Sequence, residues 1–156
     1  MTTPVSVTLT RTFAAPIDLV WRAFTDADLV VRWMKCEPGV ELEYDGWRPV
    51  VGAVFSSVMR KPGQWEVKGT GRFLEVEPHR VLAYQQDPNA QMNLPAMTVR
   101  VELAAVAGGT QVTLTHTGIP SDTMRGIIEG GWTGSLQLLR AQLDDRLGRR
   151  GERSHG

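Results

Sequence analysis

Apolar and polar residues alternate at the beginning of the chain. In the segment VSVTLTRTF, from Val5 to Phe13, every second residue is apolar and those between are serine or threonine, with one exception. A period of two is typical of a strand that packs one face on the core. The exception is Arg11, which falls on the apolar side of this strand.

The pattern then changes to a helical period. Pro16 suits a first helical turn, and Val20 and Phe24 lie one turn apart on an apolar stripe. These features predict a short helix over residues 16–24. Asp26 is a suitable N-cap for a second short helix directly after it.

Strand patterns return in six further segments, which are separated by turn signals. The dipeptide Gly108-Gly109 predicts a hairpin turn. Gly69 and Gly71 lie inside a long strand pattern and predict a bulge or a sharp bend. Residues 87–95, DPNAQMNLP, are typical of a loop. The predicted strands are residues 40–45, 52–60, 65–78, 80–86, 98–106 and 110–118.

The last predicted element is a long helix. Ser121 is a plausible N-cap, and apolar residues then recur every three or four positions from Met124 to Leu147. If helical to Arg146, the segment is about 39 Å long. The basic, polar residues 149–156 predict a disordered tail.

Four glycines interrupt this helix pattern, and each costs about 1 kcal/mol relative to alanine in a helix interior. Two interpretations stay open and are compatible. The helix could break at Gly130-Gly131, with a loop or short turn over residues 121–129 before the true helix. Alternatively, the missing side chains leave space between the helix and the sheet. The glycines are Gly126, Gly130, Gly131 and Gly134.

The order of elements predicts an α+β fold with one domain over residues 1–148. Strands joined by hairpins form an antiparallel sheet. Such a sheet has one apolar face that needs a cover, and the C-terminal helix is the only predicted element large enough to supply it. We therefore expect a curved sheet of about six to seven strands around that helix.

Composition narrows the classes of function. Lys plus Arg and Asp plus Glu both number 17, which argues against nucleic acid or an anionic membrane as the main partner. The one cysteine, Cys36, excludes an internal disulfide and fits a reducing compartment. The N-terminus lacks the features of a signal peptide, and no apolar run reaches the ~18–20 residues of a membrane span. We expect a soluble, cytoplasmic protein without membrane insertion; a homodimer is compatible with the sequence.

Catalytic and metal-binding motifs are not evident. The sequence has no G-x-S-x-G motif, and the GTG at residues 69–71 lies in a strand without the rest of a dinucleotide fingerprint. No Cys/His/Asp cluster resembles a metal site. We therefore expect no cofactor, no metal and no catalytic residue that a motif would reveal.

Four segments together resemble a known family. These are FAAPIDLVWRAFTDADLVVRWM, GRFLEVEPHRVLAY, GGTQVTLTHTG and the later Gly131-Trp132 with its following leucines. In this order they resemble the START-like, or SRPBCC, superfamily, and within it the group named after the activator of heat-shock-protein-90 ATPase. The similarity spans roughly residues 5–145. One departure is YDGWRPVVGAVFSS, where many relatives have a glycine pair before an aromatic-rich strand.

The resemblance implies a helix-grip fold, in which the sheet wraps the C-terminal helix and leaves a cavity between them. Members bind lipids, sterols, polyketides or other apolar molecules, and a few are cyclases or hydratases. The family has no shared catalytic motif, so the resemblance transfers no catalytic residue.

The sequence thus predicts a protein that binds a small, largely apolar molecule between sheet and helix. One alternative is a cyclase-like or hydrolase-like enzyme with His116, and with Tyr84 as a second candidate, in acid–base roles. Another is a protein-interaction module without a ligand, such as a chaperone helper. The residues expected to line the cavity are Trp33, Phe55, Met59, Phe73, Tyr84, Val99, Val101, Leu114, His116, Met124, Ile128 and Trp132.

Overall fold

The computed structural model describes the backbone of residues 5–154 and the side chains of residues 5–148. It contains seven strands and three helices. In chain order these are β1 (Val5–Phe13), α1 (Ile17–Thr25), α2 (Ala27–Val30), β2 (Glu41–Asp45), β3 (Val54–Lys61), β4 (Trp65–Glu77), β5 (Val81–Gln86), β6 (Met97–Val106), β7 (Gly109–Ile119) and α3 (Asp122–Ser154).

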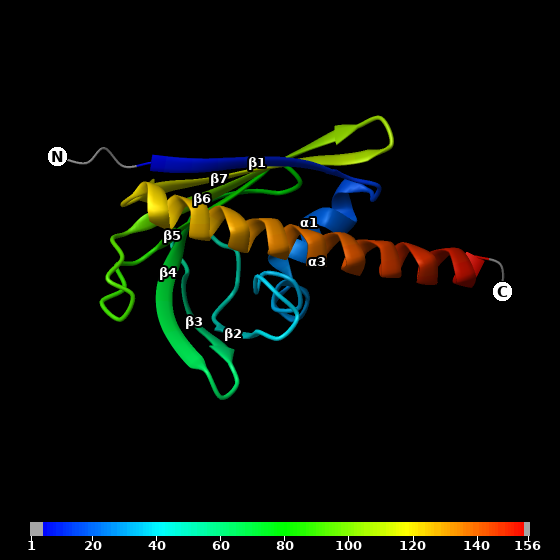
Figure 1. Cartoon of the computed structure of the whole chain (residues 1–156). Helices are drawn as coiled ribbons and strands as arrows, with labels where there is room; N and C mark the ends of the chain where they lie inside the picture. The colour runs from blue at the N-terminus through cyan, green and yellow to red at the C-terminus, as the bar shows by residue number, and fades with distance from the viewer. Residues whose placement is uncertain (1–4, 155–156) are drawn as a thin grey trace.

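The seven strands form one antiparallel sheet in the order β1-β7-β6-β5-β4-β3-β2. Strands β2 to β7 follow each other as neighbours, and β1 pairs with β7 at the edge. Figure 1 shows the sheet curving while α3 crosses it, with α1 and α2 beside the helix. The predicted helix-grip fold is therefore confirmed.

The core lies between the inner face of the sheet and α3. The alternating residues Val7, Leu9 and Phe13 of β1 are buried, as the period of two predicted. On α3 the buried apolar residues follow at steps of four, three and four, which is one face of a helix. These residues are Trp132, Leu136, Leu139 and Leu143.

Two features predicted for the strands are present but lie at other residues than expected. The register of β4 against β5 shifts between Phe73 and Glu75, not at the glycines. Packing explains the glycine at position 71 instead. A Cβ there would lie 2.6 Å from Cζ of Phe55 and 2.4 Å from the backbone oxygen of Gln85. The β6–β7 turn occupies residues 107–108, so Gly109 is already the first residue of β7.

Helix α3 is continuous across all four glycines, so the predicted break at Gly130-Gly131 is wrong. The N-cap prediction is confirmed, because the Ser121 hydroxyl accepts a hydrogen bond from the Met124 N–H at 3.1 Å. The helix also continues beyond Arg146 to Ser154, where we expected a tail; residues 155–156 lie outside the described part. Arginine and glutamate are good helix formers, which favours this extension, and its end projects beyond the sheet in Figure 1.

The glycines of α3 fall into two pairs with different surroundings. A Cβ at Gly126 or Gly130 would meet nothing within 4 Å. A Cβ at Gly134 would lie 2.0 Å from the backbone oxygen of Cys36, and one at Gly131 would lie 3.3 Å from the Cys36 sulfur. The space at Gly134 is therefore filled by the chain itself, which corrects the expectation that it is left open.

The segment that follows α2 thus docks on the small residues of α3. Besides the close approach at Gly134, the Cys36 N–H donates to the Ser135 hydroxyl at 2.9 Å. Cys36 has a φ of 72°, a conformation that few non-glycine residues adopt. We name this contact of Cys36 with Gly131, Gly134 and Ser135 the loop–helix junction.

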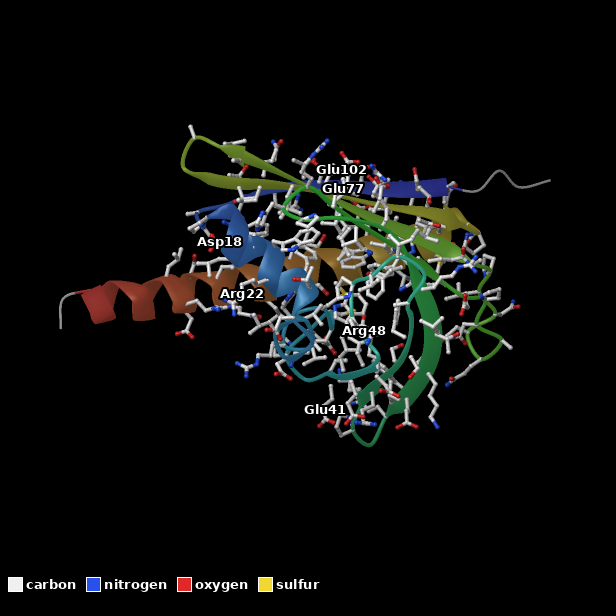
Figure 2. All side chains as sticks on the ribbon, turned by 180° about the vertical axis from the view of Figure 1, so that it is seen from behind. Asp18, Arg22, Glu41, Arg48, Glu77 and Glu102 are labelled. Atoms are coloured by element: carbon white, nitrogen blue, oxygen red, sulfur yellow. The ribbon has the colours of Figure 1, made fainter. Side chains whose placement is uncertain are left out.

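The outer surface is mixed in charge. Figure 2 shows acidic and basic side chains distributed over the side opposite to α3, without one sign dominating; the labelled ones are Asp18, Arg22, Glu41, Arg48, Glu77 and Glu102. Over the described residues, no helix combines the length and apolar character needed to cross a membrane.

Candidate functional site

A hollow of about 260 Å³ lies between the sheet and α3. Strands β2, β3, β5, β6 and β7 contribute one wall, and α3 contributes the other. The loop–helix junction closes it on one side, because Cys36, Gly131 and Ser135 are all in the lining. We name this space the inner hollow.

A second space of about 610 Å³ adjoins the inner hollow. The two share lining residues, among them Tyr44, Met59 and Met97. The second space extends between the β3–β4 hairpin and the loop of residues 87–95, where Trp65 and Met92 are 42% and 43% exposed. We name it the outer groove.

The sheet register explains why distant residues meet in the inner hollow. Tyr84 of β5 pairs with Val99 of β6, and Val99 pairs with His116 of β7. Directly paired residues lie on the same face of a sheet. The strand alternation that buries Val99 therefore also turns Tyr84 and His116 towards α3.

Of the residues predicted to line the cavity, half lie along one of these two spaces. Phe55 borders the outer groove, and Met59 borders both spaces. The other four line the inner hollow: Tyr84, His116, Ile128 and Trp132.

The other half border neither of these two spaces within the described chain. Trp33 is fully buried; its indole N–H donates to the Ala23 carbonyl at 2.8 Å and its ring packs on Phe24. It therefore packs in the core and borders neither space. The remaining five are Phe73, Val99, Val101 and Leu114, which are buried, and Met124, which packs on the core from α3.

Several lining residues were outside the predicted set. Met97 continues the alternation of Val99 on β6, and Tyr44 continues that of Leu42 on β2, so both had a signal in the sequence. Met34 and Cys36 lie outside any helix or strand, where no periodicity indicates which side chains point inwards.

His116 is held in one tautomer within the lining. The Trp132 indole N–H donates to Nδ1 of His116 at 3.0 Å. An indole nitrogen can only donate, so Nδ1 is unprotonated and the neutral ring carries its hydrogen on Nε2. Nε2 lies 3.4 Å from the Met97 sulfur. Burial lowers the pKa of His116 to about 4, so the ring is neutral at pH 7.

Two tyrosine hydroxyls in the same lining lie near one methionine sulfur. The hydroxyls of Tyr44 and Tyr84 lie 3.5 Å and 3.6 Å from Sδ of Met34. Burial raises the pKa of both phenols above the ordinary value. Both therefore remain neutral hydrogen-bond donors.

The inner hollow has no charged lining among the described residues: no Asp, Glu, Lys or Arg borders it. Although part of Cys36 is solvent-exposed, its thiol faces the junction, and burial raises its pKa. A thiol with a raised pKa is a poor nucleophile at neutral pH. Across the described chain, no three metal-ligating side chains come together. The arrangement is suited to binding an uncharged molecule.

Comparison with known proteins assigns the chain to a family. The sequence profile described as "Activator of Hsp90 ATPase homolog 1-like protein" matches residues 14–144. The chain belongs to this family. In this AHSA1-like protein the matched region contains every residue that lines the inner hollow.

Solved structures share the fold of this AHSA1-like protein. Protein CV1439 from Chromobacterium violaceum is similar with a TM-score of 0.81 and 24% identity, over 88% of this chain and 96% of that one. Protein NE0264 from Nitrosomonas europaea gives a TM-score of 0.74 and 25% identity, over 92% and 97% of the two chains. A search of curated proteins found no match.

Proposed function

We propose that this AHSA1-like chain binds a small, largely apolar molecule in the inner hollow. The observation that carries the proposal is a space of about 260 Å³ beneath α3, bordered mainly by apolar and aromatic side chains. Protein interiors otherwise pack to near-crystal density. An engineered cavity of about 150 Å³ already binds benzene, so the inner hollow has room for a molecule of about two rings.

The lining also favours an adaptable binding site. Met34, Met59 and Met97 all border the inner hollow. Methionine side chains are flexible and polarizable and adjust to irregular shapes. The outer groove supplies a route from solvent, since it shares lining residues with the inner hollow.

The same geometry favours binding over the two alternatives. An acid–base enzyme that uses His116 needs a ring nitrogen that titrates near its working pH, but burial lowers the pKa of this histidine to about 4 and Trp132 occupies Nδ1. An interaction module without a ligand would need no space beneath α3.

The test is to fill the inner hollow and measure binding of a neutral fluorescent probe, N-phenyl-1-naphthylamine. Ile128→Trp adds volume to the lining, so we expect it to weaken probe binding by about tenfold or more, from the loss of apolar burial. Gln137→Trp adds the same side chain to the exposed face of α3 and should leave the affinity unchanged. Equal affinity of Ile128→Trp and wild type would contradict the proposal.

A further inference from the structure

Three hydrogen-bond donors in the inner hollow have only sulfur as a partner. The hydroxyls of Tyr44 and Tyr84 both lie on Sδ of Met34, at 3.5 Å and 3.6 Å. The Nε2–H of His116 lies 3.4 Å from the Met97 sulfur. A thioether sulfur is a weak acceptor, whereas buried donors in proteins normally pair with oxygen. These three donors are therefore under-satisfied in the protein alone.

The donors are also fixed in their donating form. Trp132 occupies the other ring nitrogen of His116, so the hydrogen must lie on Nε2. The Tyr84 side chain is 1% exposed and is held among Trp47, Phe55 and Phe73. A pre-positioned donor loses little freedom when it binds an acceptor, which increases its contribution to affinity.

The charge around these donors selects against ions. No ionised side chain borders the inner hollow among the described residues, and Glu66 and Asp87 border the outer groove that adjoins it. Burying a carboxylate in a lining that offers no cation to pair with it is costly. The preferred acceptor is thus an oxygen of a neutral group.

We propose that the inner hollow selects neutral, apolar molecules that carry a carbonyl oxygen, which replaces the methionine sulfurs as the partner of the Tyr44, Tyr84 and His116 donors. This inference rests on the proposed function, because it names the ligand class of the same site. The side chains of Met34 and Met97 can change rotamer and make room for the carbonyl oxygen, since methionine has three rotatable side-chain bonds. Trp132 has a positioning role, because it sets the tautomer of His116.

A pair of matched ligands tests the proposal. The probes are 2-acetylnaphthalene and 2-isopropenylnaphthalene, which differ only in a carbonyl oxygen against a CH₂ group. We expect the wild-type protein to bind the ketone about threefold or more tightly than the alkene, since one net hydrogen bond contributes about that factor. In the double variant Tyr44→Phe/Tyr84→Phe the preference should disappear or reverse, because the carbonyl is then buried with fewer partners.

Two controls separate hydrogen bonding from packing. Met59→Leu removes a lining sulfur that none of the three donors contacts, so it should change both affinities by the same factor. The infrared C=O stretch of ¹³C-labelled ketone should lie at lower frequency in wild type than in the double variant, since a hydrogen bond weakens the carbonyl bond.

The outcomes distinguish this inference from the proposed function. Equal binding of ketone and alkene by wild type overturns the carbonyl preference and leaves an apolar binding site. A ketone preference that persists in the double variant overturns the role of the tyrosines. If neither probe binds wild type up to its solubility limit, the proposed function fails together with the inference.

Discussion

Gly134→Ala is expected to lower the free energy of unfolding by about 1–3 kcal/mol, a typical cost of overpacking. A Cβ at this position would lie 2.0 Å from the backbone oxygen of Cys36. The loop–helix junction would have to separate, which would also strain the hydrogen bond from the Cys36 N–H to the Ser135 hydroxyl. Urea unfolding of the purified variant measures the effect.

Matched controls lie on the same helix. Gly130→Ala and Gly126→Ala place a methyl group in open space, so each should stabilise the protein by up to about 1 kcal/mol through helix propensity alone. Glycine-to-alanine substitutions at different positions of the same helix should therefore change the free energy of unfolding in opposite directions. Stabilisation by Gly134→Ala equal to that of the controls would show that α3 and Cys36 do not approach as closely as described.

His116 should make the fold sensitive to acid. Its folded pKa is lowered to about 4 by burial, below the ordinary value of about 6.5 that applies to the unfolded chain. The unfolded state therefore binds the proton first. The contribution of His116 is fully present above about pH 6.5 and is lost as the pH falls, which amounts to about 3 kcal/mol by pH 4.

The control for this prediction is His116→Asn, which does not titrate and whose side-chain oxygen can still accept from the Trp132 indole. Carboxylates titrate in both proteins, so the quantity to compare is the difference in unfolding free energy between wild type and variant. That difference should shift by about 3 kcal/mol in favour of the variant between pH 7 and pH 4. A constant difference would mean that His116 is protonated as easily in the folded protein as in the unfolded chain.

The sequence predicted those parts of the site that lie on regular strands. His116 continues the apolar alternation of β7, so its inward orientation followed from the period of two. On β5 the residues from Val81 to Tyr84 are all buried, so there the strand itself was predictable but the orientation of Tyr84 was not. The same rule could not distinguish core from cavity. Val99 lies in the same row across the sheet, yet it is completely buried and borders neither space.

What the sequence could not predict depends on contacts between distant segments. The hydrogen bond between Cys36 and Ser135 joins residues 99 positions apart, and no local pattern relates them. Without that contact, the glycines of α3 resemble a helix break. Trp33 was expected in the cavity lining for a similar reason, since only the folded chain shows its indole bonded to the Ala23 carbonyl.

NMR of the methionine methyl groups can show directly whether the inner hollow is a binding site. The protein has six methionines; Met34, Met59 and Met97 line the inner hollow, whereas Met124 borders neither space. We expect titration with N-phenyl-1-naphthylamine to shift the ¹³C-methyl signals of the three lining residues and to leave that of Met124 unchanged. Shifts confined to Met92, at the outer groove, or no shifts among the three would contradict binding in the inner hollow.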